Sequence, residues 1–357
     1  MKIESTVTKG RGATLNPVAR FAQHEKEPVD DGWDNAANAT PIETWLTPEA
    51  ARTIITKNQS PDIPFDRSIN PYRGCEHGCI YCFARPAHSY VDLSPGIDFE
   101  TRIFYKENAA QLLEQALRKP GYRCAPIALG TNTDPYQGAE RTLGVTRELL
   151  EVMQRYRHPV TIVTKGALIE RDIDILQDMA RDRLASVMLS VTTLDNDLKR
   201  KLEPRTPSGR RRLDTVAKLA AAGIPVGVMV APIIPAINDH ELEAIVRAAH
   251  KAGATRAAYI LVRLPHEVKT LFRDWLAQHY PDRAGHVMSL IRQSRGGKDN
   301  DSRFGKRMSG EGVFAQMIGG RFKRACKSVG LAPRESSNLD TTLFAVPVEK
   351  GDQLSLL

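Results

Sequence analysis

Short apolar runs and longer amphipathic stretches alternate along the chain from about residue 100 to residue 280. Five of the short runs are apolar throughout, which is typical of parallel strands that are buried on both faces. These runs cover residues 125–130, 160–164, 185–191, 225–231 and 257–262. The amphipathic stretches predict helices near residues 107–119, 140–157, 169–182, 208–222, 239–252 and 266–279.

This alternation predicts about six βα units once an earlier strand within residues 67–74 is included. Repeated βα units form either a doubly wound sheet or a full or partial TIM-like barrel, and the periodicity alone does not choose between them. In both architectures the ligand site lies at the C-terminal ends of the strands. Functional residues are therefore expected at those ends.

The two ends of the chain lack this alternation. Residues 1–60 are polar and without a sustained period, and they predict an N-terminal arm with one helical turn near residues 48–51. The βα region is expected over residues 61–280, a basic C-terminal extension over 281–345, and a tail over 346–357. Residues 312–330 predict a helix that packs on the βα region. Its apolar face consists of Val313, Phe314, Met317, Ile318, Phe322, Cys326 and Val329.

The composition indicates a metal site in a reducing compartment. The chain has 357 residues, enough for a large buried core, and only five cysteines, three of them clustered. This usage is typical of reduced thiols and metal binding and not of a disulfide framework. The first residues lack the apolar stretch of a signal peptide, and no segment approaches the roughly 18 apolar residues of a membrane span. We expect a soluble, cytoplasmic protein without a membrane span.

Cys75, Cys79 and Cys82 lie within eight residues, in the segment RGCEHGCIYCF at 73–83. Three thiolates at this spacing can bind three irons of a cubane cluster or supply three ligands to zinc. A structural zinc site needs a fourth protein ligand, for which His77 and His88 are the nearby candidates. A cluster with three protein thiolates leaves one iron open for a substrate or cofactor. The missing fourth cysteine therefore favours the cluster.

The spacing CxxxCxxC, with Tyr81 just before the last cysteine, resembles the signature of the radical SAM superfamily. The resemblance implies an α/β fold with a partial TIM-like (βα)6 barrel, an N-terminal arm and a basic C-terminal extension. It also implies a 4Fe-4S cluster on Cys75, Cys79 and Cys82, whose open iron binds S-adenosylmethionine (SAM). In that family one electron, from a donor such as flavodoxin or ferredoxin, cleaves SAM to methionine and a 5′-deoxyadenosyl radical. This radical abstracts a hydrogen atom from the substrate.

Over about residues 60–265, the residues at the predicted strand ends are similar to those of the branch that contains spore photoproduct lyase. The resemblance implies that Thr133 and Asp134, in GTNTDPY after the second strand, bind SAM. It implies that Lys165, after the third strand, neutralises the SAM carboxylate, and that Ser190, after the fourth, contacts the ribose or the carboxylate. Each residue also has a structural explanation, as a turn, helix-end or local hydrogen-bonding residue. Taken together, at successive strand ends, they favour the cofactor site.

Three further SAM contacts are implied by the same resemblance. Ala231, in VAPIIP after the fifth strand, and Tyr81 would contact the adenine through their backbones. Glu140 would contact the amino group of the methionine moiety.

One position departs from the pattern of the lyase branch. Spore photoproduct lyase has a cysteine three residues before the Asp of the turn, and this cysteine returns a hydrogen atom to the substrate radical. The matching residue here is Thr131, whose O–H bond is too strong for that role, so the photoproduct reaction is not transferred. The remaining cysteines, Cys124 and Cys326, are predicted to be buried core residues.

The net charge of +8 is concentrated between Arg283 and Arg334, where twelve Lys and Arg stand against three acidic residues. This bias suggests a polyanion such as nucleic acid as a partner, and the alternative is a solvated surface with internal ion pairs. The basic residues expected to line a path for a phosphate backbone are Arg205, Arg210, Arg211, Arg212, Arg303, Lys306, Arg307, Arg321, Lys323, Arg324 and Lys327.

The sequence ends in Gln353, Leu354, Ser355, Leu356 and Leu357. These residues resemble the pentapeptide by which bacterial repair and replication proteins bind the DNA sliding clamp. The alternative is a tail that only packs on the barrel or extends into solvent.

Three hypotheses follow. The first is a radical SAM enzyme that abstracts hydrogen from a nucleic acid, in DNA repair or modification. The second is the same chemistry on a small molecule or a peptide. The third is a non-enzymatic, metal-bearing clamp or nucleic-acid adaptor, in which the cysteine loop is structural.

Overall fold

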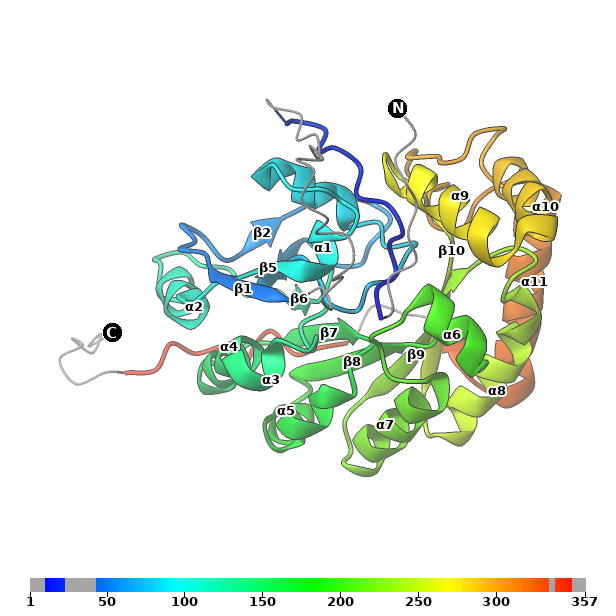
Figure 1. The fold of residues 1–357 in the computed structure, drawn as a ribbon. Coiled ribbons are helices and arrows are strands. Elements are labelled where there is room, and N and C mark those ends of the chain that lie inside the picture. The colour runs from blue at the N-terminus through cyan, green and yellow to red at the C-terminus, as the bar shows by residue number, and fades with distance from the viewer. Residues whose placement is uncertain (1–9, 23–42, 334–337, 349–357) are drawn as a thin grey trace.

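Eight strands form the central sheet of the molecule, in the order β11-β10-β9-β8-β7-β6-β3-β2 (Figure 1). The computed structural model describes residues 10–22, 43–333 and 338–348. Neighbouring strands are parallel, except that β2 is antiparallel to β3. The strands are β2 (Thr56–Lys57), β3 (Arg67–Ile69), β6 (Ile127–Leu129), β7 (Val160–Thr164), β8 (Ala185–Ser190), β9 (Val226–Ile233), β10 (Arg256–Leu261) and β11 (Ala332–Pro333).

The predicted fold class is confirmed. The five apolar runs form β6 to β10, and every residue of β8 is buried, as expected of a parallel strand covered on both faces. Within the described residues β2 and β11 form the two edges of the sheet, so the barrel is incomplete. The predicted first strand is interrupted: residues 67–69 join this sheet, and residues 72–73 join a second one.

Helices cover the outer face of the sheet (Figure 1), and their apolar sides form the main core with its strands. They are α2 (Ala109–Leu117), α4 (Val145–Arg155), α5 (Ile173–Arg181), α7 (Gly209–Ala221), α8 (Leu242–Lys251) and α11 (Gly312–Val329). The predicted helix 140–157 is broken at Gly144, whose φ of 69° is left-handed, so the short α3 (Glu140–Leu143) precedes α4. Two short 3₁₀ helices, η3 (Ala167–Asp172) and η4 (Asp239–Glu241), lead into α5 and α8.

A second core lies beside the barrel and continues across residue 280. It joins α6 (Asn196–Leu202), α9 (Val268–His279) and α10 (Pro281–Gln293) through side chains that include Phe272, Trp275 and Val287. The sequence pattern predicted α9 but not α6 or α10. In α11 the apolar face packs on the barrel as predicted, except that Val313 is 85% exposed and Met317 is also exposed.

A small sheet in the order β1-β5-β4 adjoins the cysteine loop. Its strands are β1 (Trp45–Pro48), β4 (Tyr72–Arg73) and β5 (Arg102–Tyr105), and β5 follows the short α1 (Asp98–Thr101). The helical turn predicted near residues 48–51 is wrong, because Pro48 ends the strand β1, which pairs in parallel with β5, and residues 49–51 form no helix. Pairing with a neighbouring strand decides the conformation of such a short segment. Among the described residues, no helix is long and apolar enough to cross a membrane.

Candidate active site at the cysteine loop

A cavity of about 370 Å³ opens at the C-terminal ends of the parallel strands. Cys75, Cys79 and Cys82 line it from the loop that follows β4. The strand ends contribute residues on the other side: Gly130, Thr131, Asn132, Asp134, Thr164, Lys165, Ser190 and Ala231. The structure therefore brings the cysteines and five of the predicted SAM contacts, Tyr81, Asp134, Lys165, Ser190 and Ala231, into one pocket.

Arg85 fixes the backbone of the cysteine loop. It begins η2 (Arg85–Val91), is fully buried, and its guanidinium makes five hydrogen bonds. Two of them reach the carbonyl oxygens of Cys79, at 2.9 Å, and Gly78, at 3.1 Å. Its counterion is the buried carboxylate of Glu100, 2.5 Å away. Because a guanidinium presents five donors in a fixed plane, one side chain can hold the whole turn.

Glu100 also ties the N-terminal segment to this loop. Its carboxylate accepts hydrogen bonds from the backbone amides of Gly12, at 2.9 Å, and Ala13, at 2.8 Å. A Cβ on Gly12 would lie only 1.7 Å from the carbonyl oxygen of Gly78, so only glycine fits at this contact. The predicted arm thus contains a buried segment that covers the cysteine loop.

The donor set fits a polynuclear cluster better than a single ion. In the part of the chain that the structure describes, no three His, Cys, Asp or Glu side chains converge to hold one metal ion. Three thiols that line one pocket without converging can each bind a different iron. Burial raises the pKa of Cys75 well above its usual range and that of Cys79 to about 12. A bound cation would offset this cost by stabilising the thiolates.

Of the two histidines considered as a zinc ligand, His77 lines the pocket and His88 does not. The Nδ1 atom of His77 lies 3.3 Å from the carboxylate of Asp134, and His88 packs edge-on against Phe99, away from the residues that line the pocket. Burial lowers the pKa of His88 to about 4. His88 is therefore excluded as a fourth zinc ligand, and the Nδ1 of His77 is engaged by Asp134.

Asp134 connects three parts of the site. Its carboxylate accepts hydrogen bonds from the hydroxyl of Thr164, at 2.5 Å, and from the amide of Lys165, at 2.7 Å, and faces His77. It also accepts the amide of Tyr136, as a turn residue does. Burial acts to raise the pKa of Asp134, but His77 and these hydrogen bonds hold it well below its usual range. Asp134 therefore stays ionised and joins the ends of β6 and β7 to the cysteine loop.

Lys165 is a cation inside the pocket and not a solvated helix-end residue. Its ammonium lies 5.8 Å from the ring centre of Tyr81. Burial acts to lower the pKa of Lys165, but Cys79 and Glu203 outweigh burial and raise it. A charged amine at this position can bind an anionic group such as a carboxylate.

A buried network that the sequence did not predict lies beneath Tyr81. The Tyr81 hydroxyl donates to Glu203, and the Thr192 hydroxyl donates to the same carboxylate at 2.7 Å. Arg212 pairs with Glu203 and donates to the carbonyl oxygen of Ser190 at 2.9 Å. Burial acts to raise the pKa of Glu203, but Arg212 and Lys165 lower it to about 2. The network links the aromatic residue of the cysteine loop to the end of β8.

Two predicted SAM contacts lie outside the pocket lining. The Thr133 hydroxyl donates to the backbone oxygen of Tyr72 at 2.8 Å. Glu140 is buried at the start of α3, where it accepts the amide of Thr146 at 2.9 Å and pairs with Arg171 at 2.6 Å. The structure does not bring Glu140 to the pocket, because its carboxylate is used to cap the first turn of α4.

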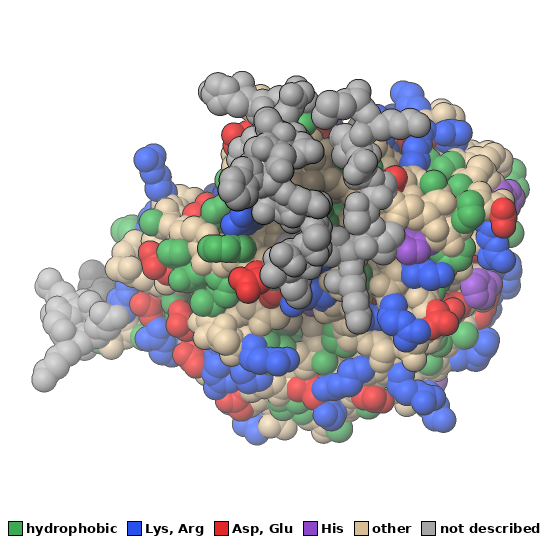
Figure 2. All heavy atoms as spheres, in the orientation of Figure 1, with side chains coloured by type: hydrophobic (Ala, Val, Ile, Leu, Met, Phe, Trp, Pro, Cys, Tyr) green, Lys and Arg blue, Asp and Glu red, His purple; other side chains and the backbone are tan. Residues whose placement is uncertain are grey.

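Most of the predicted phosphate path is neutralised by carboxylates, which corrects that expectation. Arg212 is 1% exposed and belongs to the network under Tyr81. The other ion pairs are Arg205–Glu76, Arg211–Glu170, Arg303–Asp301, Lys306–Glu311, Arg307–Asp62 and Arg321–Glu243. Figure 2 shows basic and acidic side chains interspersed over the face that carries α5 and α7. Among the described residues, the predicted cations that make no ion pair are Arg210, Lys323, Arg324 and Lys327.

An incomplete parallel barrel with three thiols at its C-terminal edge defines a cluster-binding α/β enzyme. The family model of the Radical SAM superfamily matches residues 69–249, and the chain belongs to this superfamily. Its members use a 4Fe-4S cluster and SAM, so the enzyme class and cofactors predicted from the cysteine motif are confirmed. Membership of this superfamily supports the enzyme and not the non-enzymatic adaptor.

The chain is 37% identical over 233 residues to the uncharacterized protein Rv2578c of Mycobacterium tuberculosis (strain ATCC 25618 / H37Rv), covering 65% of this chain and 68% of that protein. It is 27% identical over 217 residues to the uncharacterized protein MJ0683 of Methanocaldococcus jannaschii, covering 60% and 76%. A structure of spore photoproduct lyase complexed with dinucleoside spore photoproduct superimposes with a TM-score of 0.57 and 16% identity, over 81% of this chain and 80% of the lyase. At that identity the likeness concerns the fold.

Proposed function

We propose that this radical SAM enzyme abstracts a hydrogen atom from a nucleotide unit of a nucleic acid. Cys75, Cys79 and Cys82 would hold the cluster, and the bound cluster and SAM supply an organic radical that removes the hydrogen atom. Lys165 would bind the SAM carboxylate, while Asp134 keeps the ends of β6 and β7 in place beside it. Thr131 lines the pocket without a thiol, so the product radical is quenched differently from that of the lyase.

The environment of Arg263, just beyond β10, carries this proposal. Its guanidinium lines the cavity and makes no ion pair within 4 Å among the described residues, and its Nε atom has no hydrogen-bond partner there. It lies 5.3 Å from the ring centre of Phe83, whose side chain is 45% exposed. A cation next to an exposed aromatic ring suits a ligand with a phosphate and a planar base.

Apolar side chains face the same cavity, among them Ile63, Phe65 and Met308. Such a surface also accepts a base or an apolar side chain, so an anionic peptide is the second candidate substrate. The cationic Arg263 disfavours a neutral small molecule, which would leave that charge uncompensated.

The test measures 5′-deoxyadenosine formed by the reconstituted, reduced protein, with DNA and RNA strands or with acidic peptides. We expect nucleic acid to accelerate SAM cleavage, and Arg263→Gln to raise the KM for the strand by roughly tenfold, as loss of one charged contact does. Arg263→Lys should retain part of the affinity. A matched control is Lys251→Gln, at the exposed end of α8. Acceleration by peptides alone, or by no substrate while SAM is still cleaved, would contradict the proposal.

Binding of the sliding clamp by Gln353–Leu357 stays a prediction, because residues 349–357 lie outside the described part of the chain. The last described segment, 338–348, packs on the barrel: the amide of Ala345 donates to Tyr156, and Arg118 donates to the carbonyl oxygen of Pro347.

A further inference from the structure

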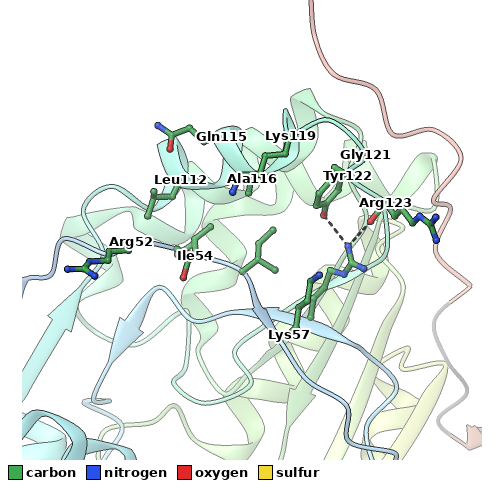
Figure 3. Close-up of a pocket in the computed structure, with 13 residues that line it drawn as sticks. Arg52, Ile54, Lys57, Leu112, Gln115, Ala116, Lys119, Gly121, Tyr122 and Arg123 are labelled. Carbon is green, nitrogen blue, oxygen red and sulfur yellow. Dashed lines mark hydrogen bonds between the residues drawn. The ribbon is translucent and has the colours of Figure 1, made fainter.

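A second cavity, of about 480 Å³, lies on the outside of the barrel between the segment around β2 and the helix α2 (Figure 3). We call it the basic pocket. Figure 3 shows Leu112, Gln115, Ala116 and Lys119 on one wall and Arg52, Ile54 and Lys57 on the facing segment. Thirteen residues line the basic pocket.

Positive charge dominates this lining. Five of the thirteen residues are Lys or Arg, and none is acidic. Arg67 is paired with Asp66 and donates to the carbonyl oxygen of Arg123 at 2.7 Å. The other four cations, Arg52, Lys57, Lys119 and Arg123, are exposed and make no ion pair within 4 Å among the described residues. Like charges held around a concavity repel one another, and an anion bound between them removes that repulsion.

The interior of the basic pocket is apolar. Ile54 is buried at its base, and Ile55, Leu112 and Ala116 are partly buried beside it. The ring of Tyr122 closes one end and lies 5.8 Å from the guanidinium of Arg67. An apolar interior with a cationic rim suits a ligand that alternates apolar rings with phosphates, as a nucleic-acid strand does.

The basic pocket is close along the chain to the cavity at the cysteine loop and the strand ends, which we call the SAM pocket. Lys57 lines the former, whereas Asp62, Ile63 and Phe65 line the latter. Five residues span at most about 17 Å when extended, so the two linings come within that distance of each other. Asp62 is held by Arg307 and by the amide of Gly305, at 2.6 Å, which fixes the loop between the two pockets.

We infer that the basic pocket binds the phosphate backbone of a nucleic-acid strand whose reacting nucleotide lies in the SAM pocket. This inference rests on the proposed function for the identity of the strand. It assigns nucleic-acid binding to cations that the sequence analysis did not select, in place of the largely neutralised path along the C-terminal region. The other source of the same chemistry is a small phosphorylated molecule, such as a polyphosphate.

The experiment compares two triple variants of the full-length, reconstituted protein that remove the same charge. The basic-pocket variant removes three cations from the pocket and carries Lys57→Gln, Lys119→Gln and Arg123→Gln. The α11 variant removes three cations from that helix and carries Lys323→Gln, Arg324→Gln and Lys327→Gln. Binding of a fluorescent single strand of about 12 nucleotides is measured by anisotropy over a series of salt concentrations. Since none of the six cations makes an ion pair with a residue that the structure describes, neither triple variant should change the melting temperature by more than a few degrees.

Removal of three phosphate contacts should reduce the slope of log K against log salt by about 2 and weaken binding by roughly tenfold at moderate salt. The α11 variant should bind like the original protein. An equal or larger loss in the α11 variant would overturn the inference, as would unchanged binding by the basic-pocket variant. Inorganic tripolyphosphate is tested as a second ligand. If the basic-pocket variant lost binding of tripolyphosphate but bound the strand unchanged, the basic pocket would be a site for a small ligand, and the inference would be overturned.

A kinetic arm separates this inference from the proposed function. A dinucleotide offers one phosphodiester to the SAM pocket and should stimulate SAM cleavage equally in the original protein and in the basic-pocket variant. A long strand should show a raised KM only in that variant. If strand binding depends on the basic pocket but no nucleic acid accelerates SAM cleavage, the inference stands and the proposed substrate is wrong. If long strands accelerate SAM cleavage equally in both proteins, the proposed substrate stands and the inference about the basic pocket is wrong.

Discussion

In the SAM pocket, the buried arginines beneath the cysteine loop each meet a carboxylate: Arg85 pairs with Glu100 and Arg212 with Glu203. In the basic pocket, Arg52, Lys119 and Arg123 are exposed and face no carboxylate within 4 Å among the described residues. A buried charge must be paired or hydrogen-bonded, because its desolvation is otherwise uncompensated, whereas an exposed one stays hydrated and available. Buried, paired arginines therefore support the walls of the first pocket, whereas the exposed cations of the second are free to bind a ligand.

The difference has an energetic consequence. Loss of one member of a buried, hydrogen-bonded pair leaves its partner buried and unpaired, and lowers the free energy of unfolding by about 3–5 kcal/mol. Loss of an exposed, unpaired cation changes the free energy of unfolding by no more than about 0.5 kcal/mol. Variants of the buried pairs beneath the SAM pocket should therefore affect folding and chemistry together, while variants of the basic pocket should affect binding alone.

The largest effect is expected at the cysteines. Cys79→Ala removes one of three cluster ligands, so iron content and formation of 5′-deoxyadenosine should both fall to background. Iron per chain and product formation are measured after anaerobic reconstitution. Cys326→Ala is the matched control, because Cys326 is a buried side chain of α11 on the core side of that helix and should leave both readouts intact. Turnover in Cys79→Ala would contradict the assignment of the cluster.

The sequence predicted the parts of this site that depend on short local patterns. The cysteine spacing fixed the chemistry, and five apolar runs predicted β6 to β10, which placed Asp134, Lys165 and Ser190 at adjacent strand ends. Those inferences needed no knowledge of tertiary contacts, because parallel strands bring their C-terminal ends to one edge of the sheet.

The remaining features depend on partners far apart in the sequence. Glu203 lies 122 residues from Tyr81, and the amides of Gly12 and Ala13 meet Glu100 across more than 85 residues. Nothing local marks Glu203 as the counterion of Arg212, so Arg212 was assigned to a phosphate path although it is buried. The basic pocket was missed for the same reason, since its cations come from segments separated by about 60 residues and form no run.

The comparison of the two pockets becomes sharper through Arg212. Arg212→Met leaves Glu203 buried without its cation and should lower the free energy of unfolding by about 3–5 kcal/mol. Arg123→Gln, in the basic pocket, should change it by less than about 0.5 kcal/mol. Denaturation in urea measures both values. Adding Glu203→Leu to Arg212→Met should recover much of the loss, because the stranded charge is gone. If Arg212→Met lowered the free energy of unfolding by less than about 1 kcal/mol, the buried Arg212–Glu203 pair would not be what stabilises the network beneath Tyr81.

The smallest effect concerns the wall behind the basic pocket, where His158 is fully buried and its Nε2 atom lies 2.8 Å from the hydroxyl of Tyr122. Burial lowers the pKa of His158 from its usual 6.5 to about 4. Below pH 6.5 the unfolded chain binds a proton at this residue that the folded chain does not, so stability falls with decreasing pH until about pH 4. A shift of this size corresponds to about 3 kcal/mol at the acid end of that range.

His158→Gln should therefore flatten the dependence of unfolding free energy on pH between 6.5 and 4. The amide of Gln can still reach Tyr122 but does not titrate, so the slope changes while the wall is retained. His88 has a pKa lowered in the same way and remains in both proteins, so the difference between the two pH profiles isolates His158. Parallel profiles would mean that the folded chain accepts the proton at His158. The wall of the basic pocket would then tolerate a buried, unpaired positive charge. The rule that buried positive charges are paired beneath the SAM pocket would not hold behind the basic pocket.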